Sequence, residues 1–113
     1  MGSLIDENFI IKNEENSFYM STITVAELYV GARNNKEIEA LDLLTNSFTI
    51  TDVDKLIAIK GGEYKRFYGR SHGVGLADAI IAACADNIGA YLVTLNVKHY
   101  PMYDKTLIPY NKN

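Results

Sequence analysis

Hydrophobic and polar positions in the first half of the chain predict a strand, two helices and a second strand. Residues 17–23 are rich in aromatic and β-branched side chains, which is typical of a short buried strand. From Thr24 to about Asn35, apolar side chains recur three and four positions apart and predict a helix. The same spacing predicts a short helix over residues 36–45, and residues 48–51 are a strand candidate.

The second half of the chain continues this alternation. Its expected elements are a helix at 53–68, a loop at 69–75, a strongly apolar helix at 76–88 that ends at Gly89, and strands at 90–95 and 105–110. In the first of these helices, Gly61 and Gly62 cost roughly 1 kcal/mol each relative to alanine, so we expect a bend or a close helix contact there. Strands that alternate with helices predict one α/β domain with a mostly parallel central sheet.

Composition adds limits rather than a function. A chain of 113 residues with 48% hydrophobic content can bury one core without metal or disulfide staples. The formal charge of −3 and the pI near 5.3 argue against a surface that coats nucleic acid, so such contact must be local or mediated by a metal. Cys84 lies in an apolar run and is expected to be a buried structural thiol. Neither a stretch of ~20 apolar residues nor a signal sequence is evident, so we predict a cytoplasmic protein without membrane contact.

Three polar residues fall where an open parallel sheet binds its ligands, beyond the carboxyl ends of the strands. We expect Glu27 in the first turn of the helix after strand 17–23, Asp78 in the first turn of helix 76–88, and Asn96 just past strand 90–95. Two carboxylates and an amide oxygen are hard ligands that suit Mg²⁺ or Mn²⁺. A divalent ion held there would neutralise a phosphate and activate a water molecule for phosphodiester hydrolysis.

Each of these residues also has a purely structural interpretation. Thr24 and Glu27 have the spacing of a capping box, in which the glutamate bonds back to the helix start. Asp78 fits the first turn of a helix because of the macrodipole, and Asn96 suits a turn. Spacing alone therefore leaves the function open. His72 and His99 are isolated and are given no role.

The basic residues of the chain are scattered. They are usually a solvated surface, although Arg33, Arg66, Arg70 and Lys98 could contact an RNA backbone. Of these, Arg70 and Lys98 stand nearest to the strand ends.

Three blocks in order carry a family resemblance: STITVAELYVGAR from Ser21, GLADAIIAA from Gly75 and LVTLNVKHY from Leu92. Together they resemble PIN-domain proteins, most closely the VapC toxins, over residues 17–110. The resemblance implies a three-layer α/β/α fold and a metal-dependent endoribonuclease. It also implies a toxin that is neutralised by a cognate antitoxin and that commonly forms a homodimer.

The resemblance also assigns roles to individual residues. Glu27 matches the second acid of the family site and Asp78 the third, while Asn96 would make a weaker metal contact, mediated by water. Hydroxyl groups of Thr24 and Thr94 would shape the pocket. These assignments agree with the positions selected from the strand ends.

The amino-terminal region departs from the family pattern. The family opens with a central apolar strand that ends in an Asp, and two helices then precede the strand that here is 17–23. Only fifteen positions separate Asp6 from Ser21, too few for two helices with their turns. We therefore predict that residues 4–11 are the end of a helix, that the first strand is missing, and that Asp6 is not catalytic. Unpaired sheet edges would then invite a second subunit.

That departure keeps a second function open. A chain that lacks the first acid would be a catalytically incomplete PIN remnant, acting as a dimerising or antitoxin-binding module. A nucleotide-binding protein is a weaker alternative, since no glycine-rich phosphate loop follows any predicted strand.

Overall fold

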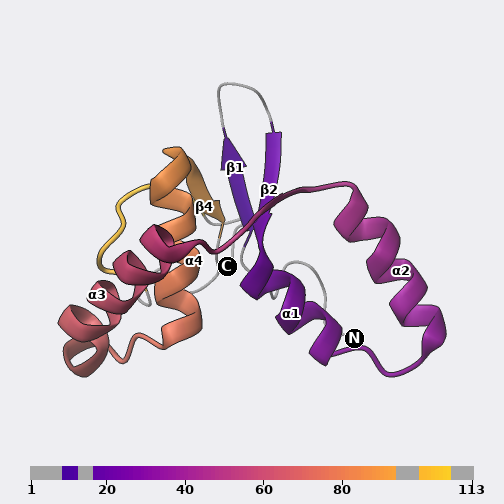
Figure 1. Cartoon of the computed structure of the whole chain (residues 1–113), viewed down its shortest axis with the longest axis horizontal. Helices are drawn as coiled ribbons and strands as arrows, with labels where there is room; N and C mark the ends of the chain where they lie inside the picture. Colours follow the sequence, from indigo (N-terminus) through magenta and orange to yellow (C-terminus); the bar gives the residue numbers. More distant parts are fainter. Residues whose placement is uncertain (1–8, 13–16, 94–99, 108–113) are drawn as a thin grey trace, which may run out of the picture.

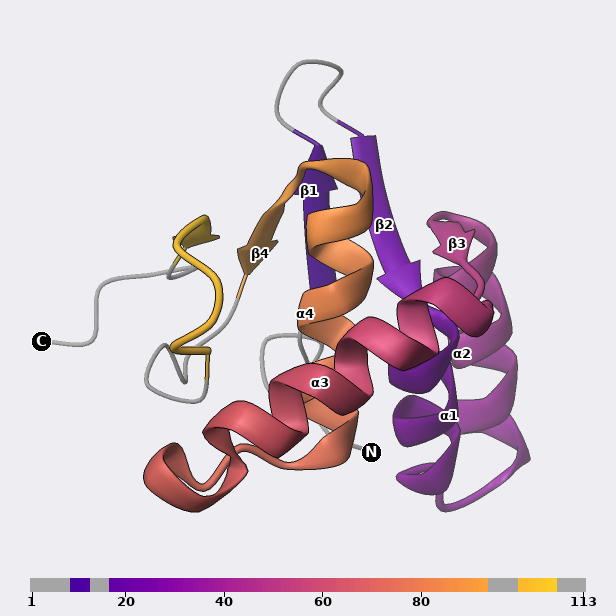
Figure 2. The same cartoon turned by 60° about the vertical axis from the view of Figure 1, so that its left-hand side comes forward.

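The computed structural model describes residues 9–12, 17–93 and 100–107. Within them, helices cover both faces of a central sheet (Figures 1 and 2). The elements in chain order are β1 (Phe9–Lys12), β2 (Ser17–Ser21), α1 (Thr22–Val30), α2 (Asn35–Asn46), β3 (Thr49–Thr51), α3 (Lys55–His72), α4 (Leu76–Ile88), β4 (Tyr91–Val93) and β5 (Thr106–Leu107).

The sheet has the order β3-β2-β1-β4-β5. Strand β2 is parallel to β3 and β4 is parallel to β5, whereas β1 is antiparallel to both of its neighbours, β2 and β4. Four strands therefore share one direction, and the central strand opposes them. The predicted mostly parallel sheet is confirmed for those four strands only.

Strand β1 corrects the prediction for the amino-terminal region. Residues 9–12 form a strand instead of the end of a helix, and this strand fills the middle of the sheet that we expected to be vacant. Its sequence, FIIK, is a short apolar run, and Ile10 pairs with Tyr19 on one side and Leu92 on the other. Pairing with a strand on each side outweighs the spacing argument that favoured a helix. Residues 4–8, with Asp6, lie outside the described residues.

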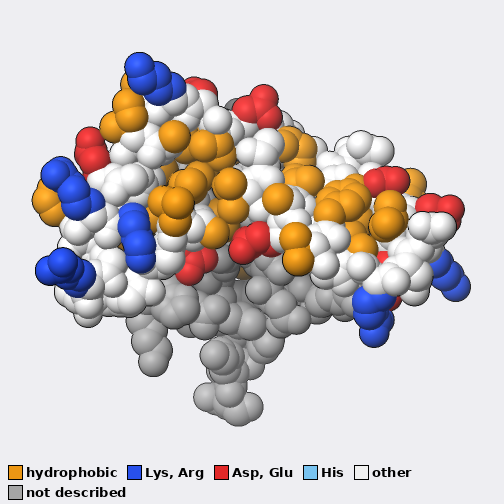
Figure 3. All heavy atoms as spheres, turned by 60° about the horizontal axis from the view of Figure 1, so that its bottom comes forward, with side chains coloured by type: hydrophobic (Ala, Val, Ile, Leu, Met, Phe, Trp, Pro, Cys, Tyr) orange, Lys and Arg blue, Asp and Glu red, His pale blue; other side chains and the backbone are white. Residues whose placement is uncertain are grey.

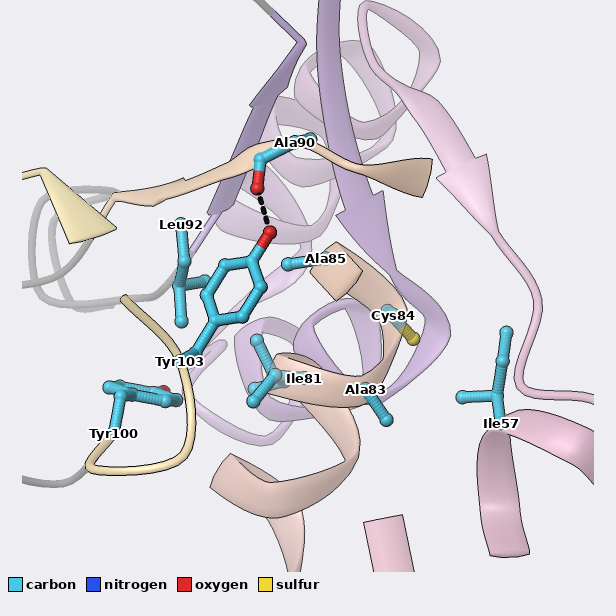
Figure 4. Close-up of a cluster of buried hydrophobic side chains, with 10 residues drawn as sticks. Ile57, Ile81, Ala83, Cys84, Ala85, Ala90, Leu92, Tyr100 and Tyr103 are labelled. Atoms are coloured by element: carbon cyan, nitrogen blue, oxygen red, sulfur yellow. Dashed lines mark hydrogen bonds between the residues drawn. The ribbon is translucent and has the colours of Figure 1, made fainter. Parts of the chain in front are cut away.

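Alternating side chains of β2 point into two separate cores. Met20 contributes to a small cluster with Leu28 and Leu41, beneath α1 and α2. Tyr19, on the opposite face, packs against a larger cluster beneath α3 and α4. That larger cluster contains Ile57, Ile81, Ala82, Ala83, Cys84, Ala85, Ala90, Leu92, Tyr100 and Tyr103 (Figure 4). Two helical layers thus sandwich the sheet, as the three-layer prediction requires.

Helix α4 has the predicted bounds and forms the centre of the larger core. It ends at Gly89, whose φ of 64° lies in the left-handed region that favours glycine. Cys84 is fully buried, as predicted, and burial raises the pKa of its thiol to about 11. A thiol in that state is protonated at neutral pH and unreactive.

Helix α3 runs without interruption through its two glycines and contacts α4 closely at one of them. A Cβ atom on Gly61 would lie 2.8 Å from Ile80 Cγ1 and 3.0 Å from Ile80 Cα, whereas one on Gly62 would meet nothing. The expected close helix contact is therefore confirmed at Gly61. The predicted loop at 69–75 is too long, because the helix continues to His72 and only then turns through Gly73, which has a φ of 65°.

Remaining boundaries differ by a few residues from the predicted ones. Strand β2 stops at Ser21, two residues earlier than expected, and α1 correspondingly starts at Thr22. Residues 94–95 and 108–110, predicted as strand, lie outside the described residues. Within the described part of the chain, no helix combines the length and the apolar character needed to cross a bilayer.

Candidate metal site at the carboxyl edge of the sheet

Helix α1 begins at the carboxyl end of β2 and is capped by a residue that the sequence reasoning passed over. The Ser21 side chain accepts a hydrogen bond from the Thr24 backbone N–H at 3.1 Å, and the two hydroxyl oxygens lie 3.3 Å apart. Both residues are buried. Because Ser21 satisfies the Thr24 amide, Glu27 is not its capping partner. Glu27 lies in the second turn of α1, so its predicted place in the first turn was wrong by three residues.

Helix α4 brings Asp78 to the same edge of the sheet. It leads through a tight turn at Gly89 into β4, so the two run in opposite directions and the amino end of α4 points toward the edge of the sheet at which β4 ends (Figure 2). Asp78 occupies the first turn of α4, as predicted, and Gly75 at the N-cap offers no side-chain hydrogen bond. Helix α1 contacts α4 directly.

Electrostatics couples the two carboxyl groups. The pKa of Glu27 is raised above its ordinary value of 4.5, first by partial burial and second by the negative charge of Asp78. Water and salt weaken such repulsion steeply with distance, so the effect indicates carboxyl groups near one another. The structure therefore brings together two acids that are fifty-one positions apart in the sequence.

Tyr100 is a further member of this cluster that the sequence reasoning missed. Its side chain is 2% exposed, and its hydroxyl donates a hydrogen bond to Asp78 Oδ1 at 3.2 Å. It was given no role from the sequence alone. The signal available in the sequence was a tyrosine that closes the third family block, four positions after Asn96.

Of the other candidate residues, the structure describes only some. Asn96, Thr94, Lys98 and His99 lie outside the described residues, so their roles stay predictions. His72 is exposed at the end of α3, where its Nδ1 lies 2.6 Å from Ser71 Oγ.

Two more observations limit the chemistry near the acids. Arg33 forms an ion pair with Glu37 at 2.8 Å, and its hydrogen bonds lower the pKa of Glu37 to about 2. Arg33 is thus engaged within the protein. Among the described residues, no group of three or more His, Cys, Asp or Glu side chains is arranged to hold a metal ion.

The surface around this edge is largely apolar. In the space-filling view, hydrophobic side chains cover much of the face, acidic side chains lie near its middle, and Lys and Arg side chains gather toward its two ends (Figure 3). Leu76, two residues before Asp78, is 54% exposed, and Val30 at the end of α1 is 85% exposed.

Comparison with known proteins identifies the fold that carries this pair of acids. A PIN-domain family model matches residues 5–104. The chain belongs to the PIN-domain family. The resemblance drawn from the three sequence blocks is thereby confirmed, and the matched region begins upstream of residue 17, where we had placed its start.

Three similar proteins show which members of the PIN-domain family this chain resembles. This PIN domain is 39% identical over 92 residues to a protein named ribonuclease VapC10 of Mycobacterium tuberculosis, covering 80% of this chain and 68% of that protein. Ribonuclease VapC19 of the same species is 39% identical over 85 residues, covering 74% of this chain and 67% of the relative. A solved toxin-antitoxin complex from Klebsiella pneumoniae contains a chain that matches with a TM-score of 0.67 and 27% identity, covering 80% of this chain and 72% of that one.

Proposed function

We propose that this PIN domain is a metal-dependent endoribonuclease and the toxin of a toxin-antitoxin pair. The observation that carries the proposal is the electrostatic coupling of Glu27 and Asp78 at the carboxyl edge of the sheet. Family membership and the two VapC ribonucleases of M. tuberculosis support the reaction class.

The two carboxyl groups fit Mg²⁺ or Mn²⁺. Their oxygens are hard ligands, and although Glu27 is exposed, its pKa is raised by partial desolvation and by the charge of Asp78, so a bound cation would relieve the repulsion. Mg²⁺ typically uses one or two protein carboxylates and completes its shell with water and substrate phosphates. Two acids are therefore a sufficient protein contribution, and RNA would strengthen the binding.

The chain's own groups would hold and orient the reactants. A bound divalent ion supplies positive charge for the phosphate and lowers the pKa of a bound water molecule. Asp78, fixed on the rigid helix α4, would set the position of the ion, while Glu27 would complete the pair from α1. Asn96 is proposed to support the ion or its water from the segment that follows β4.

Protein partners are the second part of the proposal. The Klebsiella neighbour is a toxin-antitoxin complex, and the apolar surface near the acids would suit a protein segment better than RNA alone. We propose an antitoxin that covers this face. The homodimer also stays a proposal, and its original reason, a vacant central strand, no longer applies because β1 fills that place. A clean monomer by light scattering would contradict it.

Thermal unfolding with and without metal, together with an RNA cleavage assay, tests the metal site. In chelator, Glu27→Gln should unfold at or slightly above the wild-type temperature, because it removes one of two repelling charges. Asp78→Asn also removes that repulsion but loses the favourable interaction of a first-turn acid with the helix dipole, so it should unfold close to the wild-type temperature. With saturating Mg²⁺ or Mn²⁺, the wild type should gain stability and the variants should gain much less. Cleavage of structured RNA should appear only in the wild type with metal.

Controls make the result specific. Glu39→Gln removes an exposed carboxylate from α2 and should respond to metal as the wild type does. Asp6→Asn, by our expectation for that residue, should also behave as the wild type. Equal metal responses of wild type, Glu27→Gln and Asp78→Asn would rule out the proposed site.

The central strand favours a second candidate, the catalytically incomplete binding module. Because β1 runs opposite to its neighbours, its carboxyl end, where the family places its first acid, lies at the edge away from Glu27 and Asp78. Metal binding without RNA cleavage, together with retained antitoxin binding, would favour this module.

A further inference from the structure

The Tyr100 hydroxyl links residues 100–107 to the pair of acids. Tyr100 lies 22 positions from Asp78 and donates its hydrogen bond to Oδ1 of that carboxylate at 3.2 Å. We propose that Tyr100 is a positioning residue that holds the Asp78 carboxylate in the orientation that metal binding requires. This inference rests on the proposed metal site and names a residue that sets its affinity.

The Tyr100 ring is fixed well enough to act as a reference point. It is packed in the larger core, and Figure 4 shows it to the left of Ile81 and below Leu92. Its carbonyl oxygen accepts a hydrogen bond from the Tyr103 N–H at 3.1 Å, and the Tyr103 hydroxyl in turn donates to the Ala90 carbonyl oxygen. The segment is thus tied to the start of β4 as well as to α4.

The Asp78 side chain has an alternative orientation, which a hydrogen bond from Tyr100 would disfavour. It lies in the first turn of α4, where backbone N–H groups have no intrahelical partner, and Gly75 at the N-cap provides no side chain for them. A short acidic side chain in that turn tends to rotate toward those amides. A hydrogen bond from the buried Tyr100 hydroxyl to Oδ1 opposes that rotation and restrains the orientation of the carboxylate.

The chain offers a matched control in Tyr103. Both tyrosines are buried, belong to the same short segment and donate through their hydroxyls, but Tyr103 bonds a backbone carbonyl instead of a candidate metal ligand. Replacing either by phenylalanine keeps the ring and removes one oxygen atom. A role in tying down the segment would affect both variants alike, whereas a role in orienting Asp78 would affect only one.

Calorimetric titration of the full chain with Mn²⁺ tests this difference. Tyr100→Phe should weaken Mn²⁺ binding by about 5- to 10-fold, the range expected for one lost hydrogen bond to a carboxylate. Tyr103→Phe should bind Mn²⁺ within about twofold of the wild type while unfolding at a lower temperature in chelator. Unchanged affinity in Tyr100→Phe, or an equal loss in both variants, would overturn the inference.

A second measurement, by fluorine NMR, keeps both tyrosine hydroxyls. 3-Fluorotyrosine is placed at position 100 alone, and the metal-free protein is titrated with Mg²⁺. The fluorine resonance at position 100 should shift, whereas the resonance of the same label at position 103 should not. Absence of a shift at position 100 in protein that binds Mg²⁺ would count against a link between Tyr100 and the metal. If the wild type itself binds no metal, or if Asp78→Asn binds as tightly as the wild type, the proposed metal site fails instead.

Discussion

The two acids lie on helices that pack on opposite faces of the sheet and differ in their number of buried residues. Helix α4 holds Asp78 and has six buried residues, which are Ala79 and the five residues from Ile81 to Ala85. Helix α1 holds Glu27 and has two, Thr24 and Leu28. One ligand of the proposed site is thus built on the main core, whereas the other lies on a helix that packs on the smaller cluster and reaches the main core through the partly buried Ile23.

This difference suggests a division of labour between the helices. A side chain on a densely packed helix is held in place by many neighbours, and its position changes little when a ligand arrives. A short helix on a small cluster opens locally at lower cost. We therefore expect Asp78 to define where a metal binds and Glu27 to adjust to it.

The largest expected effect on stability comes from truncating one buried side chain in each of the two hydrophobic clusters. Ile81→Ala should lower the free energy of unfolding by about 4 kcal/mol and Leu41→Ala by about 2 kcal/mol, because the smaller cluster beneath α2 can collapse more readily around a cavity. Urea unfolding in chelator measures both. Leu43→Ala, at a position that is 73% exposed on α2, is the control and should change stability by less than about 0.5 kcal/mol. Equal costs for Ile81→Ala and Leu41→Ala would break the comparison.

A smaller effect is expected where α3 supports α4. Gly61→Ala forces a Cβ against the backbone of Ile80 and should destabilise the protein by about 1 to 2 kcal/mol after the gain in helix propensity is subtracted. Gly62→Ala meets no neighbour and should stabilise it by up to about 1 kcal/mol. Thermal unfolding of the two variants should therefore shift in opposite directions. A stabilised Gly61→Ala would mean that the contact between α3 and α4 is loose.

The smallest effect should appear in the pH dependence of the metal-free protein. The folded state holds the Glu27 proton more tightly than the unfolded chain does, since the pKa of Glu27 is raised by burial and by Asp78. Its contribution to stability is therefore full below the unfolded pKa and is lost as pH rises through the raised value. Relative to Glu27→Gln, the wild type in chelator should lose stability as pH rises from 4 toward 7, by urea unfolding. A difference that does not vary with pH would indicate that the two carboxyl groups are not coupled.

Sequence patterns predicted local structure well where one element carries a complete signal. Helix α4 has its apolar run, an acid in the first turn and a glycine at its end, and its bounds were predicted correctly. Helix α1 was predicted to begin too late, because Thr24 and Glu27 imitate a capping box while the actual cap is Ser21. Both serine and threonine favour that position, and the choice depends on where β2 leaves the sheet.

The sequence by itself determined the family, the alternation of elements and the two acids to examine, because periodicity, caps and motif blocks are short-range properties of the chain. Only the tertiary structure decided that β1 lies in the centre of the sheet and runs against its neighbours, since a four-residue apolar strand pairs equally well in either direction until both partners are in place. It also decided that the Tyr100 hydroxyl meets Asp78 across 22 positions, because a hydrogen bond between distant residues is fixed by packing and leaves no periodic mark in the sequence.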